Sequence, residues 1–361
     1  MNIAWFGAAG PRPFDDTPSL HAELAGRHRI VRYDAQHAHA FVWRQFRAPA
    51  DICVYELHDR AEDAFVWPYL LHYPGVLRLR SADLGRSRRH MLRQGRRFTD
   101  DAAEAAFAGR PRLRIPLLAS RLVIVGDRAA AEALQEEYPD TRVRWIAAGV
   151  DIERGGDDVD AAHDTSRLRV GVPSVDTVID GAVRRARGSG TDVELIRLDS
   201  PADVNRCDAI AALEWPPAPE PPPGALSAMA AGKPAIVYDS PVTAGWPALD
   251  PRSWVPRGFG DRRPPIAISL DSRDAEHSLL LALVRLGADL ELRRGLGAAA
   301  RAWTATHASA ARAASAWDEA LDAAAALPAP TPPPGWPAHL RADGTERARA
   351  LLAEVGVEFP L

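Results

Sequence analysis

Short apolar runs alternate with segments of helical periodicity along the first half of the chain. The apolar runs cover residues 2–6, 28–34, 51–57, 75–79, 117–125 and 143–146, and the helical segments between them cover 18–26, 62–72 and 129–137. Strands separated by helices of about a dozen residues are typical of a parallel, doubly wound sheet. The first half is therefore predicted to form one Rossmann-like α/β domain.

The same alternation begins again after an acidic, glycine-bearing stretch at 151–167 that has no periodicity and that we interpret as an interdomain linker. Strands are predicted at 168–172, 193–198, 209–213 and 266–270, a helix at 175–187, and a strongly helical region at 274–321 with a break near Gly287. We expect an N-terminal Rossmann-like domain at 1–155 and a C-terminal one at 156–327. Residues 328–361 are expected to form a proline-rich connector and a terminal helix, 344–355, that docks back on the domains.

Composition narrows the class of protein. The 361 residues are 47% hydrophobic and carry a net charge of −4, which does not point to nucleic acid. Cys53 and Cys207 fall in separate predicted strands, so neither a disulfide framework nor a cysteine metal site is expected. No apolar run approaches the roughly 20 residues that a membrane span needs. We expect a soluble, cytoplasmic protein that could still rest on a membrane.

The glycine turn after the first strand resembles a dinucleotide site only in part. Gly7 and Gly10 would supply the turn, and Asp34 at the end of the second strand could hold a ribose. The third glycine is missing, however, and prolines 11 and 13 interrupt the start of the helix. A loop that closes over a ligand or a neighbouring domain is favoured over a nicotinamide site.

Residues 214–239 form the most informative stretch. They run from a strand end through a proline-rich loop that carries Glu220, into a helix of small residues stopped by Gly232, and then into another strand. In open α/β sheets, ligands bind beside the carboxyl ends of strands. The stretch therefore predicts a ligand site at Glu220.

Three separated segments resemble a known family in the same order: VYELHDRAEDAFVWPYLLHYPGVLRL, RLVIVGDRAAAEALQEEYPDTRVRWIAAGVD and LEWPPAPEPPPGALSAMAAGKPAIVYD. Together they are similar to the family 4 glycosyltransferases of GT-B fold, in particular to bacterial members. The resemblance implies two Rossmann-like domains facing a cleft, with a nucleotide-diphosphate sugar on the second and an acceptor on the first. It also implies a metal-independent, retaining hexosyltransferase that uses the donor as co-substrate and no other cofactor.

The resemblance carries over to particular residues. The family's E-x7-E carboxylate pair, which holds donor sugar and ribose, falls on Glu220 and Ser227, and a solvated loop acid is the alternative for Glu220. Catalysis is expected from Glu220, Arg80 and Asp59, with Arg80 stabilising the departing diphosphate or standing as an ordinary solvated arginine. Donor binding is expected from Gly171, Ser174, Glu220, Gly224, Ala225 and Ser227, and the acceptor-side loop from Gly7, Gly10 and His58.

The chain departs from the family pattern at several positions. The loop 171–176 lacks the arginine and lysine that neutralise donor phosphates in retaining members, and the second carboxylate is a serine. A catalytically silent GT-B-like protein that binds a nucleotide or a protein partner is therefore the alternative function.

Other features favour simpler interpretations. Arg78 to Arg97 contains eight arginines and one acid, which predicts a solvated helix face or contact with an anionic membrane surface. Few aromatic residues interleave it, so single-stranded nucleic acid is not expected. His37 and His39 have the spacing of metal ligands but are interpreted as loop histidines. Tryptophans among prolines in predicted loops are expected either to pack or to stack on sugars; they are Trp215, Trp246, Trp254 and Trp336.

Overall fold

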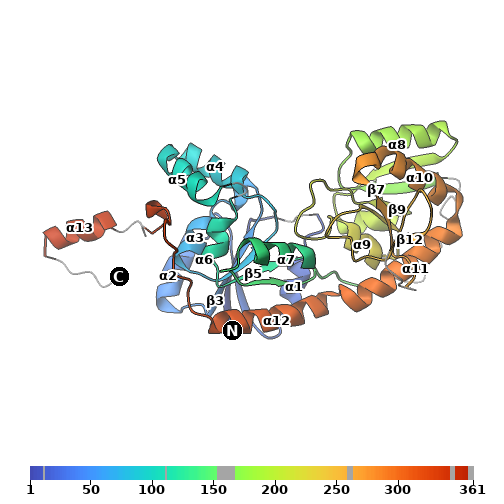
Figure 1. The fold of residues 1–361 in the computed structure, drawn as a ribbon. Helices are drawn as coiled ribbons and strands as arrows, with labels where there is room; N and C mark the ends of the chain where they lie inside the picture. Colours follow the sequence, from blue (N-terminus) through green and yellow to red (C-terminus); the bar gives the residue numbers. More distant parts are fainter. Residues whose placement is uncertain (11–12, 110–111, 153–166, 258–262, 342–345, 357–361) are drawn as a thin grey trace.

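The computed structural model describes the chain except for residues 11–12, 110–111, 153–166, 258–262, 342–345 and 357–361. Two mostly parallel sheets, each covered by helices, lie side by side (Figure 1). We refer to each sheet with the helices packed on it as the N-terminal and the C-terminal domain. The architecture confirms the predicted fold class of two Rossmann-like α/β domains. The predicted boundary at 155/156 lies outside the described residues.

The N-terminal sheet has the order β2-β1-β3-β4-β5-β6, and every pair in it is parallel. Its strands are β1 (Asn2–Phe6), β2 (Arg29–Tyr33), β3 (Ile52–Leu57), β4 (Val76–Leu79), β5 (Leu122–Val125) and β6 (Val143–Trp145). Its helices are α1 (Thr17–Leu24), α2 (His39–Arg47), α3 (Val66–His72), α4 (Gly85–Gln94), α5 (Phe98–Ala108), α6 (Arg114–Ala119) and α7 (Arg128–Glu137). The central strands β3, β4 and β5 are buried along their whole length, as continuous apolar runs in a parallel sheet should be.

The C-terminal sheet has the order β12-β11-β13-β10-β9-β7-β8, parallel except for the short edge pair β11 and β12. Its strands are β7 (Arg167–Val172), β8 (Asp192–Arg197), β9 (Ala209–Ala211), β10 (Ala235–Tyr238), β11 (Ala248–Leu249), β12 (Pro256–Arg257) and β13 (Ala267–Leu270). Its helices include α8 (Thr177–Gly188), α9 (Ala225–Ala230), α10 (Ala275–Ala288) and α11 (Leu290–His307). The carboxyl end of β9 leads directly into the loop that carries Glu220.

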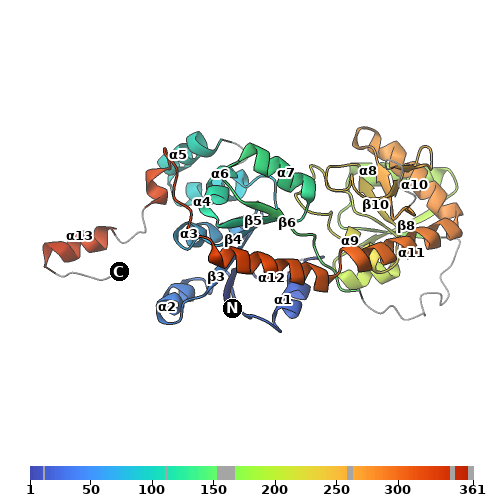
Figure 2. The same ribbon diagram turned by 60° about the horizontal axis from the view of Figure 1, so that its bottom comes forward.

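A further helix, α12 (Ala310–Ala326), follows α11 but packs on the N-terminal domain. Figures 1 and 2 show it leaving the C-terminal domain and running along the N-terminal sheet. Trp317 on α12 lies with its ring 5.2 Å from that of Trp5 in β1, and both side chains are buried. Asp318 accepts a bond from His28 Nε2 at 2.6 Å. A helix from the range expected for the C-terminal domain, 156–327, thus completes the core of the other domain.

The chain crosses between the domains at two places that lie side by side. Val150 forms a parallel bridge with Ser309, and a side chain on Gly149 would lie 2.7 Å from the Ala313 methyl group. The crossing at Gly149 therefore requires a residue without a Cβ atom. The first crossing leads from β6 toward β7, and the second leads from α11 to α12.

The segment after α12 continues along the N-terminal domain. Trp336 is buried with its ring 5.5 Å from Phe107 of α5, and His339 Nε2 lies 2.9 Å from Glu104 Oε1. The terminal helix α13 (Glu346–Glu354) was expected to dock, but Figures 1 and 2 show it apart from both domains.

Two of the predicted segments differ in detail from the structure. The helical region after β13 breaks at Asp289, close to the predicted break near Gly287, and a second time at Ser309; Asp289 and Ser309 each cap the helix that follows. Arg78 to Arg97 is not one solvated face, because Arg78, Arg80 and Arg88 are buried in ion pairs.

Candidate functional site

Loops at the carboxyl ends of strands from both sheets enclose a cavity of about 210 Å³. Six of the predicted site residues line it. They are His58, Asp59 and Arg80 from the N-terminal domain, and Glu220, Gly224 and Ser227 from the C-terminal domain. The predicted residues Gly7, Gly10, Gly171, Ser174 and Ala225 are not among its lining residues.

Arg80 lies at the centre of this cavity and joins the two domains. Its Nε atom lies 2.7 Å from Glu220 Oε2, and its Nη1 atom lies 3.0 Å from Asp16 Oδ1 and 3.3 Å from Asp15 Oδ1. The Arg80 side chain is 9% exposed. The alternative of a solvated arginine is therefore wrong for this residue, and Glu220 is not a solvated loop acid.

A second buried arginine, Arg78, shares Asp16 with Arg80. Its Nη2 atom donates to both carboxylate oxygens of Asp16 at 2.6 Å, and its Nη1 atom donates to Glu56 Oε1 at 3.1 Å. Thr17 Oγ1 also donates to Glu56, at 2.7 Å. The buried cluster therefore holds two guanidinium groups against four carboxyl groups, those of Asp15, Asp16, Glu56 and Glu220.

The excess of acids shapes the pKa values in the cluster. Burial alone would raise the pKa of Asp16, but Arg78 and Arg80 outweigh it and lower that pKa to about 2. Burial raises the pKa of Glu220, and Arg80 and Arg78 do not cancel the effect. Burial, together with the negative charge of Asp16, outweighs the two arginines, so the pKa of Glu220 stays raised despite its ion pair.

Glu214 was not assigned a role from the sequence, yet it lines the same cavity. Burial, and then the negative charge of Glu220, raise the pKa of Glu214 to about 7, while Arg60 opposes the rise. A carboxyl group with a pKa near neutrality can hold or accept a proton at physiological pH. The signal in the sequence was its place at the end of a predicted strand, six residues before Glu220.

Asp59 is held in place by α4. Asp59 Oδ1 accepts a hydrogen bond from the backbone N–H of Ser87 at 2.7 Å, and the Asp59 N–H donates to Ser81 Oγ at 3.1 Å. The carboxylate thus holds the first turn of α4 against the loop after β3. His58 is buried beside it. Asp59 therefore stabilises the start of α4 and also lines the cavity.

The start of α9 is covered by the other domain. Gly224 has φ of +83°, a left-handed conformation that favours glycine, and a Cβ atom there would lie 3.6 Å from the ring of Phe14. Ala225 is buried as the first residue of α9, which has only six residues. Ser227 lines this cavity and a neighbouring one of about 280 Å³.

The remaining predicted glycines serve other purposes. A Cβ atom at Gly171 would lie 2.5 Å from Ile210 Cδ1 and 2.8 Å from Cys207 Sγ, so packing within the sheet requires this glycine. A Cβ atom at Gly7 would lie 2.9 Å from Glu56, next to the buried cluster. Ser174 is exposed after β7, and Gly10 has φ of +99° with open space around it.

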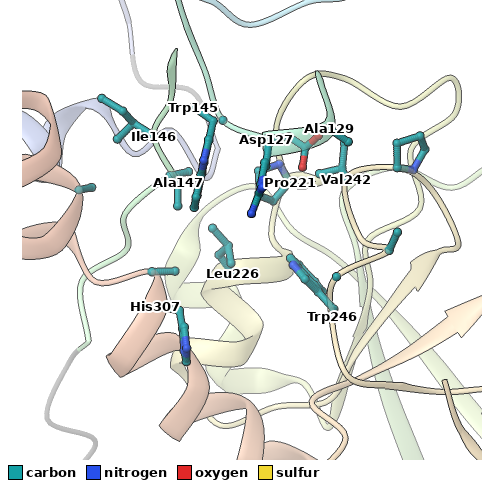
Figure 3. A pocket seen from close by; sticks show the side chains of 18 of the residues that line it. Asp127, Ala129, Trp145, Ile146, Ala147, Pro221, Leu226, Val242, Trp246 and His307 are labelled. Atoms are coloured by element: carbon teal, nitrogen blue, oxygen red, sulfur yellow. The ribbon is translucent and has the colours of Figure 1, made fainter. Parts of the chain in front are cut away.

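A larger pocket of about 590 Å³ lies on the other side of the Glu220 loop, again between the domains (Figure 3). Pro221, Leu226 and Ala148 line both this pocket and the cavity that holds Arg80. Its other lining residues come from 126–132 at the start of α7, from β6 and the residues after it, from the loop after β10, from the end of α11 and from the start of α12. The sequence did not reveal this pocket, because five segments far apart in the chain form it and no pattern within one segment shows that they meet.

In the part of the chain that the structure describes, no group of three or more histidine, cysteine, aspartate or glutamate side chains is placed to hold a metal ion. His37 contacts Asp34 at 2.7 Å in a turn before α2. Among the same residues, no helix has both the length and the apolar character needed to cross a bilayer.

Comparison with known proteins identifies the fold. No protein-family model and no curated protein sequence matches the chain. Among solved structures it is similar to Anabaena HepE in complex with UDP and glucose, with a TM-score of 0.57 and 12% identity over 90% of this chain and all of that one. The chain has a GT-B fold.

Other glycosyltransferases of similar structure support the assignment. WaaG, a glycosyltransferase involved in lipopolysaccharide biosynthesis, has a TM-score of 0.51 and 12% identity over 88% of this chain and 99% of its own. A glycosyltransferase from Rickettsia africae has a TM-score of 0.51 and 10% identity over 90% and 98%. At such identities the likeness concerns the fold, and the assignment to family 4 remains a resemblance.

Proposed function

We propose that the protein is a glycosyltransferase that moves a sugar from a nucleotide-diphosphate donor to an acceptor hydroxyl group. The observation that carries the proposal is the interdomain cavity in which Glu220 and Ser227 from one domain face Arg80 and Asp59 from the other. The GT-B fold supports it, and HepE, which shares that fold, has been crystallised with UDP-glucose.

The residues of the cavity suggest their parts in the reaction. Glu220 would accept hydrogen bonds from the sugar hydroxyls, and Ser227 would contact the ribose. Arg80, turned from Glu220 toward the donor, would stabilise the departing diphosphate. The acceptor oxygen would bond to the anomeric carbon, the bond from that carbon to the diphosphate would break, and the hydroxyl proton would leave with the diphosphate. We propose retention of configuration and no metal, as in the resembling family.

Glu214 adds a proton-transfer group to this scheme. Its raised pKa and its place in the cavity would let it take the acceptor proton before the diphosphate receives it. Domain closure about the two adjacent crossings would exclude water, which protects a donor that could otherwise be hydrolysed.

The test is calorimetric titration with a panel of nucleoside diphosphates and their sugars, followed by a donor-hydrolysis assay. We expect binding to at least one nucleotide, weakened by Glu220→Gln and by Ser227→Ala. No binding to any nucleotide at millimolar concentration would overturn the proposal.

One observation favours the alternative, a catalytically silent GT-B protein. Arg80 already pairs with Glu220, and the buried cluster has more acids than arginines, which disfavours an anionic donor. Nucleotide binding without hydrolysis or transfer, over a range of acceptors, would favour this alternative over the enzyme.

We further propose that the protein works in the cytoplasm, and that the exposed arginines of α4 and its surroundings contact an anionic membrane surface. Four arginines of the run 78–97 are exposed: Arg86, Arg93, Arg96 and Arg97. Co-sedimentation with vesicles that contain phosphatidylglycerol, compared with phosphatidylcholine vesicles, tests this proposal; equal sedimentation with both would contradict it.

A further inference from the structure

The pocket beyond the Glu220 loop is built mainly from apolar side chains. Trp145, Trp246 and Trp303 line it, together with Leu226, Pro221 and Ala147. Figure 3 shows Trp145, Trp246 and His307 approaching from three sides, with Leu226 between them. Its volume of about 590 Å³ lies within the range of roughly 300–1,000 Å³ that is usual for small-molecule sites.

The aromatic side chains form a connected set. The rings of Trp246 and Trp303 lie 5.8 Å apart at 54°, and the His307 ring stacks on Trp303 at 4.9 Å and 17°. Trp145 is 50% exposed, although tryptophan usually gains by burial. An exposed indole at the mouth of an aromatic pocket offers a ring face to a ligand.

Apart from Arg312, the polar side chains that line the pocket are already engaged within the protein. Arg128 pairs with Glu132 at 2.8 Å, Asp127 caps α7 by accepting from the Ala130 N–H at 2.8 Å, and His307 Nδ1 bonds the Trp303 carbonyl at 2.9 Å. A carbohydrate would need many hydrogen-bonding partners in its site. The pocket is therefore suited to a flat, apolar ligand.

The pocket adjoins the proposed reaction centre. Pro221 and Leu226 line both spaces and lie between them, and Glu220 lies next to Pro221 in the chain. A ligand that fills the pocket would direct a polar group past Leu226 to reach the sugar that Glu220 would hold.

We propose that this pocket binds the aromatic part of the acceptor, so that the acceptor is a planar aromatic compound with a hydroxyl group. The acceptor role rests on the proposed glycosyl transfer, whereas binding of the aromatic ring does not depend on it. Stacking on the tryptophans would hold the ring, and the hydroxyl oxygen would face the donor.

The experiment measures binding of 2-naphthol to the full chain by calorimetry, and compares it with the saturated analogue decahydro-2-naphthol. We expect one site, with naphthol bound at least tenfold more tightly than the analogue. Trp145→Ala should weaken naphthol binding tenfold or more, and Ala147→Phe should fill the pocket and abolish it. Trp43→Ala, which removes another exposed tryptophan, on α2, is the matched control.

Each outcome is decisive because Trp145 is half exposed and its loss should leave the fold intact, which thermal unfolding can verify. Naphthol binding that is absent, or unchanged in both pocket variants, or equal to that of the analogue, overturns the proposal. Nucleotide binding is measured in parallel in Ala147→Phe. If naphthol binds as expected while no nucleotide binds to any variant, the proposed transfer fails and the aromatic site remains.

Discussion

At the scale of single residues, Arg80 does the most to join the two domains. It is the one residue in the described cavity that pairs with acids of both, Glu220 on one side and Asp15 and Asp16 on the other. Removing its charge would leave buried carboxylates without compensation, which typically costs about 3–5 kcal/mol.

We therefore expect Arg80→Gln to lower the free energy of unfolding by about 3–5 kcal/mol at pH 7, measured by urea denaturation. The loss should be smaller at pH 4.5, where the acids freed from Arg80 can bind protons. Arg89→Gln, which changes an arginine on α4 outside the cluster, serves as the control. An equal loss at both pH values would show that lost packing, and not charge, is responsible.

Glu214 predicts a different pH dependence. Its pKa is raised to about 7 in the folded protein, above its ordinary value of 4.5, so the folded state binds more protons than the unfolded state between these values. The favourable contribution is present below pH 4.5 and is lost as the pH rises through about 7. We expect Glu214→Gln to raise the melting temperature at pH 8 and to leave it unchanged at pH 4.

A scanning calorimetry series from pH 4 to 8 checks this expectation. If the difference between Glu214→Gln and the unchanged protein is constant over the series, Glu214 is ionised normally in the folded state. Glu194, a half-exposed acid in β8 that pairs with Arg167 at 3.6 Å, provides the Glu→Gln control.

The sequence predicted part of this site. Glu220, Ser227, Arg80 and Asp59 were expected to meet in a cleft, and they do line one cavity. The partners of Arg80 could not be predicted. Asp15 and Asp16 lie in the loop between β1 and α1, and the sequence does not show where this loop runs. Gly171 was expected at the donor, but its neighbours in space, Cys207 and Ile210, reveal a packing role.

At the scale of elements, α12 decides the integrity of the N-terminal core. Its buried face contributes Ala314, Trp317, Ala320, Leu321 and Ala324 to the cluster that contains Trp5 and Ile3. The sequence predicted a helix here, but helical periodicity states only that one face is buried, and not which sheet covers it.

Trp317→Ala should therefore destabilise the protein by about 3–5 kcal/mol, because Trp317 is 2% exposed and its removal leaves a cavity against Trp5. Trp43→Ala, at a residue 61% exposed, should change the free energy of unfolding by about 0.5 kcal/mol or less. Chemical denaturation of both variants makes the comparison. Similar losses in the two would mean that α12 does not hold the core in solution.

Helices α4 and α5 show why a charge run is an ambiguous signal. Arg88 bonds Glu104 through Nε at 2.9 Å and Nη2 at 2.6 Å, and its guanidinium lies 4.9 Å from the Trp67 ring. The acid comes from a different helix, so the sequence around Arg88 could not show that it is buried. The sequence predicted that the arginines of 78–97 form one surface. In the structure some of them are exposed and others, such as Arg88, are buried in ion pairs.

At the scale of the whole molecule, the last part of the chain belongs to the first domain. Residues 310–340 cover the N-terminal sheet and α5, while α13 lies apart from both domains. Residues 310–340 therefore belong structurally to the N-terminal domain, although they lie more than 150 residues after its last strand, β6.

A pair of truncations tests this arrangement. Ending the chain after Arg341 removes α13 and should leave the melting temperature within about 2 °C of the original, because α13 packs on neither domain. Ending it after Ser309 removes α12 and should abolish cooperative unfolding of the N-terminal domain. Circular dichroism during heating measures both. A cooperative transition retained without α12 would contradict the arrangement.

The return of α12 to the N-terminal sheet also sets an order of events during synthesis. Domains generally fold from the N-terminus as they are made, at about 5–20 residues per second. After β6 is made, about 180 further residues must follow before α12 is complete at Ala326, which takes on the order of 10–35 seconds. During that interval α1 contacts Trp5 through His21, but the cover that α12 provides is missing. The nascent chain therefore exposes an apolar surface until its last helices emerge, and a chaperone that binds apolar surfaces would have that long to engage it.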